Sequence, residues 1–461
     1  MPTGYTAAGH QQLGPGLAHD TLTGRSPDEA VNVARLSPNA PFELRAVPSN
    51  GAVGRGLERT SSICVRVKCA VAINGDFFGP HNDIPLGGVV SLGRLLRSPS
   101  SDHQQLMLSP NGTLSTGELT LTATLITTDL RSLHIDAMNQ ALGRNGVVLY
   151  TPAFGSSTGT PRGTAEVVLR ARRPAGPIVL GKTTVVGVAR SASRRGNSAI
   201  PSDGAVLAAN GSATGRLIDV LERIANGAAS DDALLRLDAS SGAIESIGGG
   251  PVLVRHGQVV VPDVHNAFYL GRNPRTIVGW TPAGEILLVT VDGRQQGRSA
   301  GMTLLEAAHF MIGLGASEAM NLDGGGSTTF VAQGHVLNVP SDRAVRRGRS
   351  TVVVGDVDTK DPILGYVERP VATALVVVPK TGTVDRADDA FSTLPIPLTI
   401  QASSVQAAAP ASSSDGSEPA IVVPVKSTRS ALPIIAFMFV TLAALGAGTQ
   451  RFLPATLAVR R

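Results

Sequence analysis

Short apolar runs separated by turn residues dominate the middle of the chain. Between Leu106 and Val168 such runs alternate with Gly, Pro, Asn and Ser. The clearest runs there are residues 120–126 and 146–150, and the pattern continues through residues 178–188 and 204–208. Runs of this length and setting are typical of β-strands. Only residues 217–224 form a short helical patch, so this region is predicted to be β-rich.

Residues 285–323 predict a strand, a helix and a second strand. Thr303 and Glu306 have the spacing of a capping box, and Gly315 is a plausible stop for the helix that they open. Apolar residues of the helix fall on one stripe, formed by Leu304, Ala307, Ala308, Met311 and Ile312. The apolar run 285–291 precedes the helix, and a shorter run ending at Asp323 follows it.

This order of elements predicts where two carboxylates lie. If both strands join one sheet, the helical crossover makes them parallel, and the connection between them is right-handed. Asp292 and Asp323 then lie at the same carboxyl edge, where open α/β sheets bind ligands. Residues 275–280 precede the turn 281–284, and antiparallel pairing across this turn brings Arg275 to the same edge.

Three consecutive glycines follow Asp323 and precede Ser327. Gly324, Gly325 and Gly326 could form a tight turn whose N–H groups bind an anionic oxygen, because glycine has no Cβ to block close approach. An ordinary hairpin turn is the alternative. A two-residue turn needs fewer glycines, which favours the binding interpretation.

A second polar group follows the buried strand predicted at residues 69–73. Asn74 and Asp76 flank Gly75 there, and Asp76 is either a turn residue or a part of a site. Residues 248–251, Gly-Gly-Gly-Pro, form another loop where the backbone could approach a ligand or simply turn.

Several of these stretches together resemble the phosphodiester glycosidase family. Asn321-Leu-Asp-Gly-Gly-Gly-Ser327 is similar to the family hallmark, and further matches follow the expected order from about residue 72 to about residue 350. They are residues 72–78, 149–152, 248–253, 273–276, 291–294 and 301–303. The resemblance implies hydrolysis of sugar-1-phosphodiesters in an exported or lumenal compartment. It also implies a substrate or structural-metal role for Asp76.

Cleavage of a glycosyl–phosphate bond needs positive charge near the departing phosphate and carboxylates near the anomeric carbon. The predicted catalytic residues are therefore Asp292, Asp323 and Asp76. The predicted substrate-binding residues are Asn74, Arg275, Arg294, Asn321, Gly324, Gly325, Gly326 and Ser327. Guanidinium groups bind phosphate in a bidentate manner, which suits Arg275 and Arg294 to the first task. Glu306 is explained by helix capping.

No cofactor is expected, although oxygen ligands at Asp76 or Asp323 could hold calcium or magnesium. The histidines show no metal pattern: His81 with Asp83, and His134 with Asp136, have no partner cluster. The metal ligands, if any, are unassigned.

Composition excludes a nucleic-acid footprint. The net charge is +5 over 461 residues, and no basic stripe is interleaved with aromatics. Only residues 343–349 are locally rich in arginine, either as a solvated loop or to hold an anionic substrate. The expected partners are a sugar-1-phosphodiester or an anionic glycopolymer, and a membrane. Cys64 and Cys69 are expected to form a small disulfide in an oxidising compartment, with reduced thiols as the alternative.

The two ends of the chain give localisation signals. The first residues lack a basic start and an apolar core, so by themselves they are not a signal peptide. Residues 401–430 are rich in Ala, Ser and Pro and predict a disordered linker. Residues 431–450 lack charge and are long enough for a transmembrane helix, followed by a short basic tail at residues 451–461. The slight basic excess after the helix favours an extracellular catalytic domain.

The predicted fold class is α+β, with a mixed β-sheet and flanking helices in a catalytic domain at residues 1–355. Residues 356–400 are expected to be a small β appendage or an extended tail. Two other functions remain open: non-catalytic binding of an anionic surface polysaccharide, and a phosphodiesterase that cuts on the phosphorus side.

Overall fold

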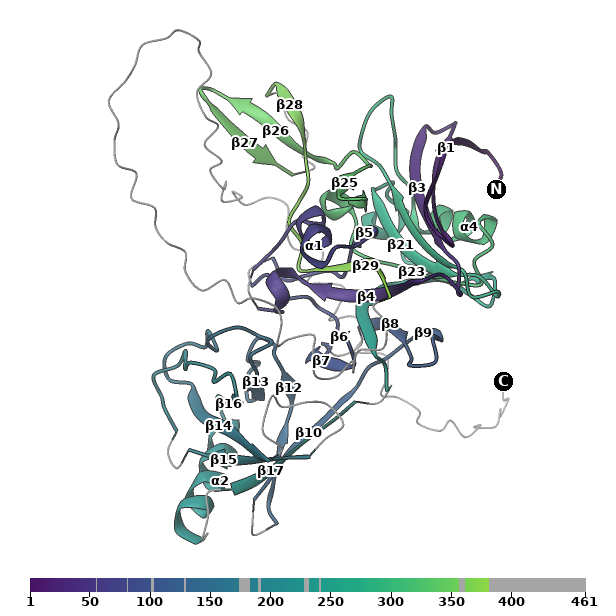
Figure 1. Ribbon diagram of the computed structural model, residues 1–461. Coiled ribbons are helices and arrows are strands. Elements are labelled where there is room, and N and C mark those ends of the chain that lie inside the picture. Colours follow the sequence, from purple (N-terminus) through teal and green to yellow (C-terminus); the bar gives the residue numbers. More distant parts are fainter. Residues whose placement is uncertain are drawn as a thin grey trace, which may run out of the picture.

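The computed structural model describes residues 1–380, apart from gaps at 55, 81, 101–102, 128–129, 174–182, 190–191, 228–231, 240–241 and 356–360. Within these residues the fold is mostly β, with strands β1–β29 and four α-helices (Figure 1). The predicted α+β class is therefore wrong. The helices are α1 (Thr60–Val67), α2 (Ala213–Gly227), α3 (Ala267–Leu270) and α4 (Leu304–Gly313), with 3-10 turns η1 (Ser49–Gly51) and η2 (Gly325–Ser327).

In the upper part of the molecule in Figure 1, which is called the upper lobe here, the largest sheet has eight strands. In spatial order they are β1 (Tyr5–Gly14), β2 (Leu17–Gly24), β3 (Glu29–Leu36), β22 (Ile286–Val291), β21 (Arg275–Trp280), β23 (Glu318–Asn321), β19 (Val252–Arg255) and β20 (Gln258–Val259). Strand β21 is antiparallel to both neighbours, with Arg275 opposite Val291 and Ile277 opposite Asn321. Strands β22 and β23 therefore run in the same direction, as predicted, although β21 lies between them.

A second sheet packs against the first one. Its strands are β25 (His335–Val336), β24 (Phe330–Ala332), β5 (Val71–Asn74), β29 (Thr373–Pro379) and β4 (Phe42–Pro48). The core between them takes Leu288 and Met320 from the first sheet and Ile73 and Phe330 from the second. Helix α4 covers the opposite face of the first sheet, where Leu287 and Val289 are buried.

This layering explains why the fold-class prediction was wrong. One face of the large sheet is covered by another sheet and the other face by a helix, so the central strands β21, β22 and β23 are buried on both sides. The helix itself was predicted correctly, except that Phe310 is buried in place of Ile312, which is only partly buried. Thr303 and Glu306 form the expected capping box, and the buried positions are Leu304, Ala307, Ala308, Phe310 and Met311.

The predicted domain boundary at residue 355 does not match the edge of the fold. Strand β29 lies between β4 and β5, and its side chains Leu375 and Val377 are buried in the core. Strand β28 (Ile363–Val367) pairs with β26 (Asp342–Arg347), which also pairs with β27 (Ser350–Val354). Residues 363–379 are thus built into sheets that also contain earlier strands.

The remaining strands form two sheets. A five-stranded sheet consists of β7 (Arg94–Arg97), β6 (Val89–Ser91), β18 (Glu245–Gly249), β8 (Gln104–Leu108) and β9 (Leu114–Gly117). The lower lobe in Figure 1 holds α2 and an eight-stranded sheet. Its strands are β11 (Ser132–Ile135), β10 (Leu121–Thr127), β17 (Asp232–Ala239), β15 (Thr183–Val188), β14 (Ala165–Arg173), β16 (Gly204–Ala209), β13 (Val147–Tyr150) and β12 (Ala137–Met138). The predicted β-rich middle region is confirmed.

Two further predictions concern covalent structure and the C-terminus. Cys64 and Cys69 form the expected disulfide, with 4.9 Å between their Cα atoms. The predicted linker at residues 401–430, the predicted span at residues 431–450 and the tail at 451–461 lie outside the described residues. Among the residues that are described, no helix is long and apolar enough to cross a membrane.

Candidate active site

The loops that follow β5 and β23 meet where the two packed sheets join. The Asn74 side chain connects them: its Nδ2 donates to the Asp323 carbonyl at 2.6 Å, and its Oδ1 accepts from the Thr276 hydroxyl at 2.7 Å. The Asp323 amide donates in turn to the Gly75 carbonyl at 3.0 Å. Asn74 is fully buried, so it fixes the site's backbone and does not face a substrate.

Asp76 is fully buried, and both of its carboxylate oxygens have partners. Oδ1 contacts His103 Nε2 at 2.8 Å, and Oδ2 accepts from the Gly87 amide. The Asp76 amide donates to the Thr373 hydroxyl at 3.0 Å. Gly248 lies so close that a Cβ there would collide with the Asp76 carboxylate. Gly248, in the last part of strand β18, therefore packs against this carboxylate, so the first of the three predicted loop glycines lies in a strand.

Asp323 differs from Asp76 because it is partly exposed. Burial raises the pKa of its carboxyl to about 6, and the charge of Asp76 acts in the same direction. The nearby Ser327 hydroxyl, the Arg369 charge and the Gly324 amide lower this pKa without offsetting burial. A carboxyl with this raised pKa exchanges its proton near neutral pH, as a general base requires.

In the glycine turn after Asp323, the Gly325 amide is not available to the predicted anion. The Gly325 amide donates to the Pro274 carbonyl at 3.0 Å, and the Ser327 amide donates to the Gly324 carbonyl at 3.3 Å. These N–H groups already have acceptors within the protein. Gly326 is needed for another reason, because a Cβ there would collide with the side chains of Arg369 and Asp342.

Arg369 and Asp342 form a bidentate ion pair directly over Gly326. Arg369 Nε and Nη2 donate to the two Asp342 oxygens at 2.8 and 2.7 Å. Burial lowers the pKa of Arg369, but the bonds to Asp342 and the negative charges of Asp342 and Asp323 outweigh it and raise the pKa. Sequence reasoning missed both residues, because neither stands in a motif.

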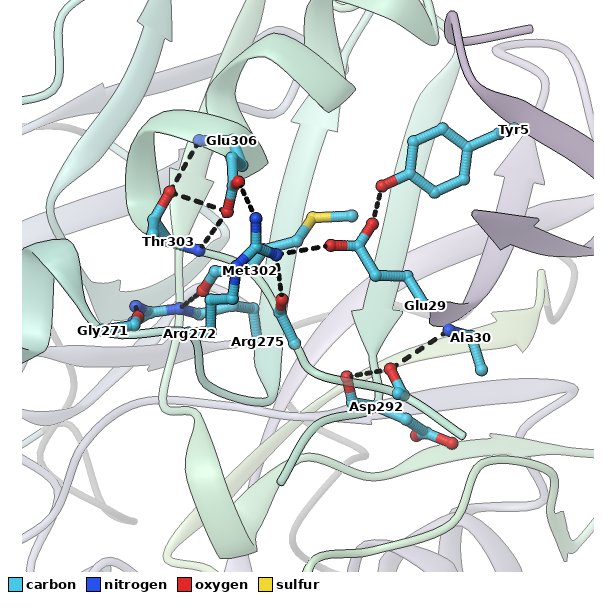
Figure 2. A network of polar contacts seen from close by, with 12 residues as sticks. Tyr5, Glu29, Ala30, Gly271, Arg272, Arg275, Asp292, Met302, Thr303 and Glu306 are labelled. Atoms are coloured by element: carbon cyan, nitrogen blue, oxygen red, sulfur yellow. Dashed lines mark hydrogen bonds and ion pairs between the residues drawn. The ribbon is translucent and has the colours of Figure 1, made fainter. Parts of the chain in front are cut away.

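The predicted phosphate-binding arginines have different environments. Arg275 is buried, and its guanidinium donates to the carbonyls of Met302, Phe268 and Gly271 at 2.8–2.9 Å. Figure 2 shows Arg275 with Gly271 and Met302. Burial lowers its pKa to about 10, and the charge of Arg294 contributes. These three backbone acceptors make Arg275 a structural residue that holds the 268–271 and 302 segments together.

Arg294 interacts electrostatically with the Arg369–Asp342 pair. Its Nε and Nη2 donate to the Asn273 side-chain oxygen at 3.1 and 2.6 Å. Burial lowers its pKa, the charge of Arg369 lowers it further, and Asp342 opposes both. Arg294 and Arg369 are therefore within electrostatic reach of each other, an arrangement that favours a bound anion.

Asp292 lies at the predicted edge of the sheet, but its carboxylate is already bound by other groups of the protein. It accepts from Asn338 Nδ2 at 3.1 Å and from the Val339 amide at 3.0 Å, and it contacts Arg298 at 3.4 Å. Burial raises its pKa, and these donors partly offset the rise. The carboxylate whose charge contributes to the raised pKa of Asp323 is Asp76.

Two other predicted binding residues are also buried. Asn321 Nδ2 donates to the carbonyls of Gly250 and Leu322 at 2.9 and 2.7 Å, which ties β23 to the glycine loop. Ser327 is buried beside Asp323. In the described ranges, no group of three or more His, Cys, Asp or Glu side chains is placed to hold a metal ion.

Comparison with known proteins agrees with the resemblance seen in the sequence. Residues 161–378 match the model of the phosphodiester glycosidase family. The N-acetylglucosamine-1-phosphodiester alpha-N-acetylglucosaminidase of Bos taurus is 30% identical over 146 residues, which are 27% of this chain and 27% of that protein. The chain thus spans about a quarter of the length of the curated relatives that it matches. Asp76 and His103 precede the matched range, whereas Asp323 and Arg369 lie within it.

Two solved structures have the same fold. A protein from Synechocystis superposes with a TM-score of 0.58 at 23% identity, over 79% of this chain and 62% of that one. A protein from Burkholderia pseudomallei gives a TM-score of 0.57 at 22% identity, over 76% of this chain and 74% of that one. These likenesses extend the shared fold well beyond the range of the family match.

Proposed function

We propose, from the confirmed resemblance to the phosphodiester glycosidases, that the chain is a hydrolase that cleaves the glycosyl–phosphate bond of sugar-1-phosphodiesters. N-acetylglucosamine is the proposed sugar, because the curated relatives are named for it. The observation that carries the proposal is Asp323, a partly exposed residue whose carboxyl pKa is raised by burial to about 6 and responds to the charges of Asp76 and Arg369.

In the proposed reaction Asp323 is the general base. A water molecule gives a proton to its carboxylate while the water oxygen bonds to the anomeric carbon. The bond from this carbon to the phosphate oxygen breaks, and its electron pair leaves with the phosphate. A free sugar and a phosphomonoester result. Phosphate is a good leaving group, so the reaction needs no strong acid on that side.

The arginines near Asp323 would stabilise the departing phosphate. The charge of Arg369 lowers the pKa of Asp323, and the same charge lowers the pKa of Arg294. Positive charge held in place before the reaction lowers the energy of developing negative charge at little reorganisation cost. Asp76, held by His103 and Gly87, would act as a fixed negative charge that favours positive charge at the anomeric carbon.

Asp323→Asn tests the general base. It should lower release of N-acetylglucosamine from its 1-phosphodiesters by about 100- to 10,000-fold. Asp263→Asn makes the same change at an exposed side chain and should keep full activity. Undiminished hydrolysis by Asp323→Asn would remove this residue from the mechanism.

The bond that breaks is tested with oxygen-18 water. Label in the sugar supports the proposed glycosidase, whereas label in the phosphate would identify a phosphodiesterase. Failure to free any sugar from a panel of such diesters or from an anionic glycopolymer would favour a binding protein. The same assay with and without a chelator tests whether Asp76 or Asp323 needs a divalent cation.

The proposed site of action is an extracellular or other oxidising compartment. The Cys64–Cys69 disulfide supports this proposal, because such bonds persist mainly where thiols are not kept reduced. Fractionation of cells that express the native chain, followed by assay of each fraction, tests it.

A further inference from the structure

An arginine-lined cavity lies beside the candidate active site. It has a volume of about 550 Å³, which is in the usual range for small-molecule sites. One wall is the loop from Arg294 to Ala300, and the other is formed by Arg343 of β26 with Ile363 and Tyr366 of β28. Arg294 belongs to both places, because it lines the cavity and is within electrostatic reach of Arg369.

The loop wall is held in place by its own hydrogen bonds. Gln295 and Ser299 exchange backbone bonds at 3.0 and 2.9 Å, and the Ser299 hydroxyl donates to the Asp292 carbonyl at 2.6 Å. Gln295 Nε2 also donates to the Val339 carbonyl at 2.7 Å. The Asp292 carbonyl thus anchors this loop, and the Asp292 carboxylate contacts Arg298 of the same loop at 3.4 Å.

Positive charge exceeds negative charge around the cavity. Its lining contains Arg294, Arg298 and Arg343 but a single carboxylate, Asp28, with Asp292 behind Arg298. Arg343 Nη2 donates to the Arg294 carbonyl at 3.0 Å, and Arg343 Nε is buried without an acceptor among the described residues. Like charges gathered in this way favour an anionic ligand.

The opposite wall offers apolar surface to the same ligand. Tyr366 and Ile363 are 46% and 47% exposed on β28. An aromatic ring next to charged donors is a surface on which a sugar ring can pack while its charged group is bound.

From this combination we infer that the cavity is a subsite for the aglycone of the substrate, and that it selects an aglycone sugar that carries a second negative charge. This inference rests on the proposed function and specifies the chemistry on the far side of the scissile phosphate. The enzyme should therefore favour diesters from anionic glycans over diesters with neutral aglycones.

The test compares two N-acetylglucosamine-1-phosphodiesters whose aglycones are glucose and glucuronic acid, which differ by one carboxylate. The full chain should show a KM on the order of tenfold lower for the glucuronic acid diester, as expected for a charge-assisted hydrogen bond. Arg298→Gln and Arg343→Gln should remove this preference, while kcat for the glucose diester stays unchanged in Arg298→Gln.

Arg346→Gln is the matched control. It removes one positive charge from the same strand β26, but Arg346 is exposed and does not line the cavity, so the preference should persist. Arg343→Lys keeps the charge and should retain part of the preference, which separates loss of charge from misfolding. Equal KM values for the two diesters in the unaltered chain would overturn the inference and leave the proposed function standing.

Calorimetric titration of both diesters decides the case in which neither is hydrolysed. Tighter binding of the glucuronic acid diester that is lost in Arg298→Gln and kept in Arg346→Gln would support the subsite even though the proposed reaction had failed. Equal binding of the two diesters by the unaltered chain would overturn it.

Discussion

At the scale of single residues, the raised pKa of Asp323 predicts the pH dependence of activity. A general base must be ionised, so kcat should fall as the pH drops through about 6, where this carboxyl takes up a proton. Measuring kcat between pH 4 and pH 9 checks this expectation. A flat profile across pH 6 would show that the protonation of Asp323 does not limit the reaction.

The same pKa predicts an effect on stability. Its folded value of about 6 exceeds the ordinary 3.8, so the folded protein holds this proton more tightly and stability falls as the pH rises between these values. Asp323→Asn removes the buried charge. It should raise the free energy of unfolding at pH 8 by at most about 3 kcal/mol, at about 1.4 kcal/mol per pKa unit.

Urea unfolding of both proteins at pH 8 and pH 4 measures this difference. The gain should be absent at pH 4, where the carboxyl is protonated in the folded protein. A variant that loses stability at pH 8 would mean that hydrogen bonds to the carboxylate outweigh its burial.

The sequence reveals site residues that stand in a local pattern, but not those that reach the site from distant segments. Asp76 and Asp323 each stand beside glycines at the end of an apolar run, so local pattern was enough to select them. His103 and Arg369 reach the same site through contacts between distant segments. Asp292 had the right pattern as well, but its hydrogen bonds to Asn338 and Val339 show only in three dimensions.

At the scale of elements, the end of strand β18 predicts a steric test. A Cβ on Gly248 would collide with the Asp76 carboxylate and the backbone of Gly87. Gly248→Ala should therefore displace Asp76 and lower kcat by about tenfold or more, since small misplacements at a site are costly. The activity assay with the N-acetylglucosamine diester checks it.

Gly143→Ala is the control, because a Cβ there meets nothing within 4 Å. It should change neither activity nor stability measurably. Unchanged activity in Gly248→Ala would mean that the position of Asp76 is not critical.

The elements themselves were predicted better than their arrangement. The strand, helix and strand of residues 285–323 and their common direction follow from short-range rules, and the structure contains them. What covers the sheet is decided elsewhere in the chain. Strand β1 is mostly exposed and has no clear apolar alternation, so its pattern gave no sign that β1–β3 extend the large sheet.

At the scale of the whole molecule, the site depends on a strand that comes late in the sequence. Strand β29 pairs with β4 over its full length and with β5 on its other side. Its first residue, Thr373, accepts the bond from the Asp76 amide, and Arg369 lies four residues earlier. Strand β29, at the end of the described chain, thus helps to hold Asp76, which lies near the beginning of the chain.

Two truncations test this dependence. A chain ending after Lys380 retains β29 and should fold and hydrolyse the diester like the full chain. A chain ending after Val354 leaves β4 and β5 unpaired at this position and exposes the core around Leu375 and Val377, so it should fail to fold. Circular dichroism and thermal melting measure both. A cooperative melt for the shorter chain would mean that the two sheets pack without their shared strand, and that the fold ends where composition alone had placed its boundary.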